Sequence, residues 1–207
     1  MKKLLLLPAL LLGSAAAHAQ TNAVKVDILQ PIINTLALSF EHKLSESSSF
    51  QIGVSGTFGY KNEGGFSNSD ALKTSGFAIT PEYRFYLSEK RPALEGFYVA
   101  PYLRYQHLSQ SGTYYSNYYY DPNNPNYQPA GQKYEASLNA FGLGVVVGRH
   151  WIFKQKFSLD AYAGPGYNVT GVSSNLPDGR VTKDDFFGYI DGVNYDLRIG
   201  LTFGIAF

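Results

Sequence analysis

The chain has 207 residues and a formal net charge of +1, with 17 Tyr, 14 Phe and 21 Gly but no Cys. A nearly neutral chain has no polybasic surface, so nucleic acid is not an expected partner. Without Cys there can be no disulfide and no lipoprotein processing at a Cys, and the length fits a single domain.

The N-terminus has the pattern of a cleaved signal peptide. A pair of lysines precedes an apolar core at Leu4–Leu12, and Ala17-His18-Ala19 is a small-x-small cleavage site. The apolar core is too short to cross a bilayer as a helix. We therefore predict a signal peptide over residues 1–19 and one exported domain over residues 20–207.

Beyond the signal peptide, eight segments alternate apolar and polar residues with the period of a β-strand. Alternation places the apolar side chains on one face of a strand and the polar ones on the other. The expected strands are, in chain order, Val24–Ile32, Thr35–Lys43, Phe50–Gly59, Phe77–Leu87, Phe97–Gln106, Tyr134–Phe153, Phe157–Val169 and Val193–Phe207.

Prolines and a phase change interrupt the alternation. Pro81, Pro101 and Pro165 lie within expected strands, and each predicts a bulge or a locally broken ladder because proline has no N–H to donate. Pro31 weakens the far end of the first segment in the same way. The sixth segment changes phase around Leu138–Ala140, which predicts a bulge there.

The connections between the segments alternate in length. The short turns are expected at 44–48, 88–94 and 154–156, and the long loops at 61–73, 110–133 and 170–192. With the N-terminus in the periplasm, these three short turns fall on the periplasmic side, and the long loops fall outside together with a tight turn at 33–34. This asymmetry is typical of outer-membrane barrels.

The last segment, Val193–Phe207, alternates most regularly: odd positions are large and apolar, and even positions are charged, polar or small. A strand that crosses a bilayer needs about ten such residues. The chain here resembles the small outer-membrane β-barrels of the OmpA-transmembrane and OmpX type, and more closely the small uncharacterised barrel families of that size. The resemblance implies that Phe207 is the signal by which the barrel-assembly machinery reads the C-terminal strand.

We therefore predict an all-β protein, an eight-stranded antiparallel up-and-down transmembrane β-barrel in the outer membrane of a Gram-negative bacterium. The expected role is structural or interactive rather than enzymatic, with outer-membrane lipid, lipopolysaccharide and a surface ligand or protein as partners. A soluble periplasmic β-sandwich or ligand carrier is an alternative, but aromatic residues recur near both ends of the expected strands, as in the two belts of a membrane barrel.

No cofactor or metal is expected. The acid-rich segment 178–185 lacks the ligand spacing of a calcium loop, and His42 and His150 have no metal-ligand spacing.

Charges of both signs occupy the inward faces of the expected strands. Eight strands leave an interior just wide enough for side chains, and buried charges must be paired. We predict a closed, salt-bridged interior, with an open ion path as the alternative. The expected network contains Lys25, Asp27, Glu41, Glu82, Arg84, Arg104, Asp160, Asp196 and Arg198.

The loop 110–133 is the main candidate for binding at the surface. Tyr set among Ser, Gly and Asn makes an adaptable contact surface. The alternative is a loop that covers the barrel mouth and contacts itself and lipopolysaccharide. The candidate binding residues are Tyr114, Tyr115, Tyr118, Tyr119, Tyr120 and Tyr127.

His107 and Ser109 are the candidate catalytic residues, because alternation places both on the outward face near the outer rim. The arrangement is similar to that of the outer-membrane lipid A deacylases, in which a His-x-Ser pair faces lipid, and a Ser beside a His is a nucleophile that hydrolases use. The family's fuller motif has Asn after the Ser, where this chain has Gln110, and no acid lies at the expected spacing. A lipid A deacylase-like hydrolase at the rim is therefore the enzymatic alternative.

Overall fold

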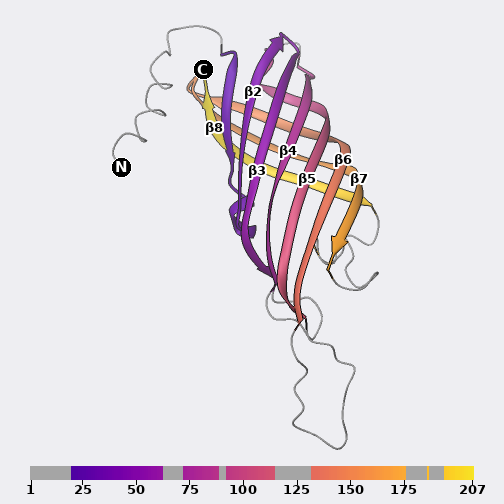
Figure 1. Cartoon of the computed structure of the whole chain (residues 1–207). Helices are drawn as coiled ribbons and strands as arrows, with labels where there is room; N and C mark the ends of the chain where they lie inside the picture. Colours follow the sequence, from indigo (N-terminus) through magenta and orange to yellow (C-terminus); the bar gives the residue numbers. More distant parts are fainter. Residues whose placement is uncertain (1–19, 63–71, 89–91, 115–131, 176–185, 187–193) are drawn as a thin grey trace, which may run out of the picture.

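A computed structural model describes residues 20–62, 72–88, 92–114, 132–175, 186 and 194–207. Eight strands in this part of the chain form one closed barrel in sequence order, and every neighbouring pair, including β1 with β8, is antiparallel (Figure 1). The strands are β1 (Asn22–Asp27), β2 (Thr35–Ser45), β3 (Ser48–Asn62), β4 (Leu72–Tyr86), β5 (Gly96–Tyr114), β6 (Gln132–Phe153), β7 (Phe157–Ser174) and β8 (Tyr195–Ala206).

The predicted eight-stranded up-and-down barrel is thus confirmed, and the alternative of a two-sheet sandwich is wrong because a single sheet closes on itself. Among the described residues, no helix is long and apolar enough to cross a membrane. The expected signal peptide, 1–19, lies outside the described residues.

Strand β1 is shorter than the alternation indicated. It ends at Asp27, and the 3₁₀ helix η1 (Gln30–Ile33) connects it to β2. The Asp27 carboxylate accepts the backbone N–H groups of Leu29 and Gln30 at 2.8 and 3.2 Å, which turns the chain out of the strand. The helix has Pro31 in its first turn, where the missing N–H is not needed.

Most other strands extend into the expected loops. β5 continues to Tyr114 and β6 begins at Gln132, so these two strands have 19 and 22 residues. A tilted strand crosses a bilayer in about 9–11 residues. The β5–β6 hairpin therefore extends well beyond the thickness of a membrane, whereas β1 has 6 residues.

The three strand prolines each break the ladder on one side. Pro81 pairs in register with β3 but is skipped between β4 and β5. Pro101 pairs with β6 and is skipped between β4 and β5, and Pro165 pairs with β8 and is skipped between β6 and β7. The register is unchanged across each gap, so the ladder is locally broken, as predicted, without a bulge.

The bulge predicted around Leu138–Ala140 is wrong, because β6 keeps its register with both neighbours through this stretch. Leu138 faces the interior, where it is fully buried and packs against Leu108. The alternation resembled a change of phase here only because Leu138, an apolar residue, occupies an inward position that polar or small residues mostly occupy elsewhere on the strand. A shift does occur between β3 and β4 at Thr57/Tyr60, beside Gly59, whose φ of 61° favours a residue without a Cβ.

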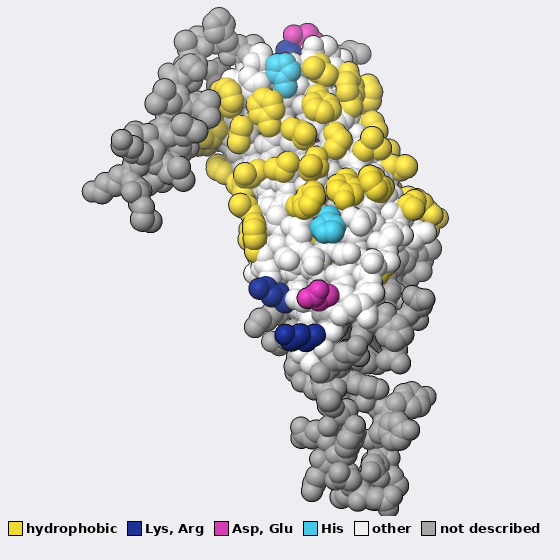
Figure 2. Space-filling view, viewed as in Figure 1, with side chains coloured by type: hydrophobic (Ala, Val, Ile, Leu, Met, Phe, Trp, Pro, Cys, Tyr) yellow, Lys and Arg dark blue, Asp and Glu magenta, His cyan; other side chains and the backbone are white. Residues whose placement is uncertain are grey.

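The outer surface of the barrel is apolar on every strand. Figure 2 shows hydrophobic side chains over the middle of the wall, with the visible charged side chains toward its two ends. One large apolar residue per strand, each between 46% and 63% exposed, illustrates the pattern: Val24, Leu36, Val54, Phe77, Leu103, Leu143, Val169 and Leu197.

Candidate functional site

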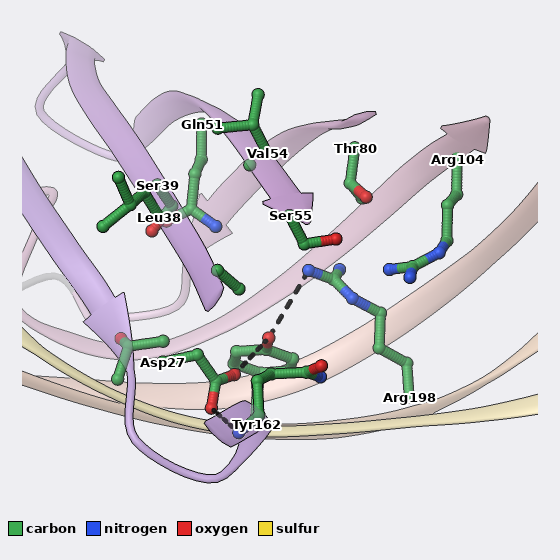
Figure 3. A pocket seen from close by; sticks show the side chains of 14 residues that line it. Asp27, Leu38, Ser39, Gln51, Val54, Ser55, Thr80, Arg104, Tyr162 and Arg198 are labelled. Atoms are coloured by element: carbon green, nitrogen blue, oxygen red, sulfur yellow. Dashed lines mark hydrogen bonds between the residues drawn. The ribbon is translucent and has the colours of Figure 1, made fainter. Parts of the chain in front are cut away.

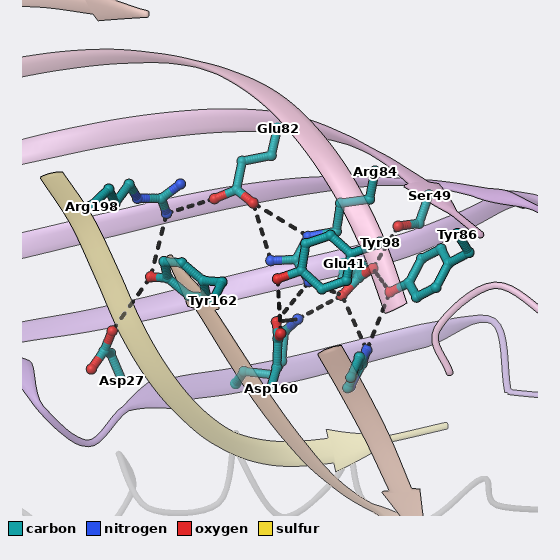
Figure 4. Close-up of polar contacts among 12 residues, drawn as sticks. Asp27, Glu41, Ser49, Glu82, Arg84, Tyr86, Tyr98, Asp160, Tyr162 and Arg198 are labelled. Atoms are coloured by element: carbon teal, nitrogen blue, oxygen red, sulfur yellow. Dashed lines mark hydrogen bonds and ion pairs between the residues drawn. The ribbon is translucent and has the colours of Figure 1, made fainter. Parts of the chain in front are cut away.

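The inside of the barrel is charged. Its most tightly connected part lies near the end of the barrel that has the short turns, where β1 begins and β8 ends, and which we call the turn end. Glu41 and Asp160 each contact both Lys25 and Arg84 (Figure 4). Lys25 Nζ lies 2.6 Å from Glu41 Oε2 and 2.9 Å from Asp160 Oδ2. Arg84 Nη1 lies 3.2 and 2.6 Å from the same two oxygens. We call these four fully buried side chains the charge square.

Hydroxyl groups complete the coordination of both carboxylates in the charge square. Tyr86 Oη and Ser49 Oγ donate to Glu41 Oε1 at 2.6 and 2.5 Å. Tyr98 Oη donates to Asp160 Oδ1 at 2.8 Å, and the Arg84 guanidinium lies 4.3 Å from the Tyr98 ring centroid. A buried ion pair is tolerated when its remaining hydrogen-bonding positions are satisfied, and these hydroxyls satisfy them.

Glu82 connects the charge square to a second layer of interior side chains, which is formed by Arg198, Tyr102 and Tyr162. Its Oε2 lies 3.1 Å from Arg84 Nη2, and its Oε1 lies 2.6 Å from Arg198 Nη2. The Arg198 guanidinium is in turn 4.9 and 4.8 Å from the ring centroids of Tyr102 and Tyr162. The ion pairs therefore form a continuous chain from the turn end toward the middle of the barrel.

The other three expected interior charges are placed differently. Asp27 is buried and binds the start of η1, and Tyr162 Oη lies 3.5 Å from its Oδ2. Arg104 and Asp196 are partly buried and make no ion pair with any described residue.

His150 belongs to this site, although sequence reasoning set it aside. It is fully buried, and its Nδ1 lies 3.3 Å from Tyr86 Oη and 3.7 Å from Glu41 Oε2. Its even-numbered position continues the inward face of Gly144, Val146 and Gly148, so alternation could have found it. The tyrosines of the network were likewise at inward positions but were not counted as partners of the charges. Among the described residues, no group of three His, Asp or Glu side chains is arranged to hold a metal ion.

A cavity of about 60 Å³ lies in the second layer, between β1–β4 on one side and Arg104 and Arg198 on the other (Figure 3). Small polar side chains, among them Ser55, Thr80 and Thr202, line its walls.

His107 and Ser109 occupy the outward face of β5, as alternation indicated. His107 Nδ1 lies 2.9 Å from Asn139 Oδ1, which also accepts the Tyr105 hydroxyl at 2.9 Å. No hydrogen bond between His107 and Ser109 occurs within the described ranges. The imidazole is thus engaged by an amide, and the pair is not assembled as a base and nucleophile.

The other expected sites lie partly outside the described residues. Tyr114 ends β5 and its side chain is not described, while Tyr115, Tyr118, Tyr119, Tyr120 and Tyr127 fall in the range 115–131. Phe207 is described and is 44% exposed. Its backbone exchanges two 2.9 Å hydrogen bonds with Asn22, which closes the barrel next to the chain end.

A closed barrel of eight strands with an apolar exterior and a charged, side-chain-filled interior has the fold of the small outer-membrane β-barrels. Within that class, the chain belongs to the family described as "Protein of unknown function (DUF3575)", whose family model matches residues 5–175. No curated protein matches the chain.

Three solved structures are similar in fold. CarO2 of Acinetobacter baumannii is 9% identical, with 91% of this chain and 98% of that chain covered and a TM-score of 0.50. CarO of Acinetobacter baumannii is 10% identical (92% and 98% covered, TM-score 0.48). A major outer membrane protein from Thermus thermophilus is 16% identical (92% and 100% covered, TM-score 0.46).

Proposed function

We propose that the protein is an integral barrel of a Gram-negative outer membrane that presents its long loops at the cell surface and is closed by its interior ion pairs. The observation that carries the proposal is the inversion of polarity: exposed apolar side chains on the outside of all eight strands and buried charges within. Contiguous exposed apolar surface on this scale is rare in soluble monomers. In a bilayer, the same surface contacts lipid, and the closed sheet leaves no unpaired edge.

The connections support one orientation. β2–β3, β4–β5 and β6–β7 are joined at the turn end by residues 46–47, 87–95 and 154–156, where Ala23 of β1 also pairs with Ala206 of β8. The opposite end, which we call the loop end, has the two longest connections, 115–131 and 175–194, together with 28–34 and 63–71. Outer-membrane barrels have short periplasmic turns and long external loops, so the turn end faces the periplasm.

Aromatic contacts support a membrane boundary toward the loop end. Tyr105 lies 6.0 Å from Phe77 and 4.8 Å from Phe141 between ring centroids, so the three rings connect β4, β5 and β6. Tyr167 and Tyr195 form a second pair across β7 and β8 at 5.9 Å. Tyr and Phe at this level would contact lipid headgroups, including lipopolysaccharide in the outer leaflet.

The charge square supports a closed barrel rather than a channel. Its four side chains and their hydroxyl partners are buried across the interior, so an ion would have to break several charge-assisted hydrogen bonds to pass. We expect the purified protein to produce no stepwise conductance in a planar lipid bilayer.

The membrane assignment is tested on outer-membrane fractions by electrophoresis with and without boiling, after protease treatment of intact cells. The expected result is heat-dependent mobility, with cleavage confined to 61–73, 110–133 or 170–192. A protein that is recovered in the soluble fraction and shows no shift would contradict both the location and the orientation.

The surface role is tested by replacing residues 115–131 with a Gly-Ser linker, using the same replacement of 63–71 as the control. Both variants should keep the heat-dependent shift, because the linkers join strands whose pairing is unchanged. Binding of purified lipopolysaccharide is expected to fall with the first replacement alone. Equal binding by both variants would remove the Tyr-rich loop from the proposed function.

A further inference from the structure

The cavity of the second layer is surrounded by polar groups without partners. Arg198 Nη1 and Thr202 Oγ1 are buried atoms for which the described residues provide no hydrogen bond. Gln51 Oε1 is also buried without a hydrogen-bond partner among the described residues. Rotation of the Gln51 amide by half a turn would present its NH₂ group to the cavity instead. A buried polar atom without a partner costs about 1–3 kcal/mol. Several such atoms around one cavity therefore indicate a site for a polar ligand.

Arg104 gives this site its chemistry. Its guanidinium lies next to that of Arg198 at one end of the cavity (Figure 3). Nothing in the described part of the chain pairs with it, and it experiences the positive charge of Arg198. A guanidinium inside a barrel that has neither a carboxylate nor a hydrogen-bond acceptor is unfavourable, and its planar array of N–H donors matches the oxygens of a carboxylate or phosphate.

The nearby acids do not fill this position. The Asp27 carboxylate also lines the cavity, but it already accepts two backbone N–H groups and faces the Tyr162 hydroxyl. Glu82 is committed to Arg84 and Arg198. Asp196 attracts Arg104 but forms no ion pair with it and does not line the cavity. The cavity-lining groups that lack a partner among the described residues, those of Arg104, Arg198 and Thr202, are therefore mainly hydrogen-bond donors.

The volume limits the size of the ligand. The cavity has a volume of about 60 Å³. On the same volume scale, a single buried water needs about 10–15 Å³. The cavity can therefore hold a ligand of a few heavy atoms. We propose that it binds one small oxyanion, a carboxylate or a phosphate, between Arg104 and Arg198, with Thr202 as a further donor.

The test uses the full chain refolded in detergent and isothermal titration calorimetry with inorganic phosphate and, separately, with acetate, each against a chloride blank of equal ionic strength. Wild type is expected to bind one of the two saturably at one site per barrel, and the anion that binds identifies the ligand class. Arg104→Gln should weaken this binding at least about tenfold, because it removes charge-assisted hydrogen bonds.

Arg149→Gln is the matched control, because Arg149 lies against Phe97 and Trp151 outside the cavity. It should bind like wild type. The melting temperature of Arg104→Gln without anion should be no lower than that of wild type, because the change removes repulsion from Arg198. This readout separates loss of binding from loss of folding.

Two results would overturn the proposal: no saturable heat with either anion, or equal affinities in the Arg104→Gln and Arg149→Gln variants. If Arg104→Gln does not refold, Ser55→Leu gives an independent answer, because it fills the cavity from β3. Saturable binding that survives Ser55→Leu would also exclude this cavity as the site. Heat-dependent mobility of each variant reports the barrel separately, so the membrane assignment does not depend on the outcome.

Discussion

Replacing Asp160 with Ala should destabilise the barrel more than any change of an exposed charge. The Asp160 carboxylate accepts hydrogen bonds from Lys25 at 2.9 Å, from Arg84 at 2.6 Å and from the Tyr98 hydroxyl at 2.8 Å. Its side chain is fully buried. Its removal leaves Lys25 and Arg84 sharing Glu41, so excess positive charge stays inside the barrel. Breaking a buried ion pair by removing one partner costs about 3–5 kcal/mol, which is the loss in unfolding free energy that we expect.

The protein contains its own probe for this measurement. The chain has one Trp, Trp151, which pairs with Leu159, one residue before Asp160. Urea unfolding of the refolded protein in detergent can therefore be followed by its fluorescence. Glu46→Ala is the control, because the Glu46 side chain is 84% exposed and its ion pair with Lys43 belongs to a class that contributes about 0–1 kcal/mol.

A double-mutant cycle adds a second criterion. Lys25→Met combined with Asp160→Ala should cost less than the sum of the single changes, because the combined change removes an opposite pair of charges, with a coupling energy of about 1–3 kcal/mol. The reasoning fails if Asp160→Ala unfolds with the same free energy as Glu46→Ala, or if the two single changes are additive.

A Cβ at Gly200 would lie 2.2 Å from the Tyr162 ring, so Gly200→Val should lower the unfolding free energy by about 1–3 kcal/mol. Adding Tyr162→Ala should recover part of that loss, and no recovery would show that the ring is not the obstacle. Leu143→Arg on the outer wall, where Leu143 is 59% exposed, should cost about 2–4 kcal/mol in vesicles, while Ser111→Arg near the loop end should cost about 1 kcal/mol or less; equal costs would argue against a membrane around β6. Cells producing His107→Ala should give the same lipid A mass spectrum as wild type, because this imidazole is bonded to an amide rather than to a serine, and a loss of deacylated lipid A in the variant would reinstate the hydrolase.

The alternation of side chains was sufficient to predict the order of the strands and, except in the first half of β6, the inward face of each. Lys25, Glu41, Arg84 and Asp160 were all assigned to inward positions from the period alone, and all four are buried. The assignment worked because side-chain direction in a strand depends on the local backbone and not on what lies opposite. The prediction of the first strand was less accurate, since the Asp27 side chain ends it by capping the next turn.

Apolar residues on the inward face misled the sequence reasoning. Leu138 faces inward and is buried against Leu108, so a hydrophobic contact inside the barrel was interpreted as a bulge. Sequence alone cannot show that this region of the interior is apolar, because that depends on which inward residues of β5 and β6 face each other. The prolines illustrate the same limit: a broken ladder was predictable, but the side on which each breaks depends on the register of both neighbours.

By itself, the sequence determined an eight-stranded barrel with an apolar outside and a charged inside, because a period of two residues is a local property of the backbone. The tertiary structure decided which charges meet. Lys25 and Asp160 are 135 residues apart and are 2.9 Å apart in space, because the pairing of β8 with β1 closes the sheet and brings β7 close to β1. The same closure placed His150 and four tyrosines around the ion pairs and left Arg104 beside a cavity, since such contacts depend on packing across the interior rather than along a strand.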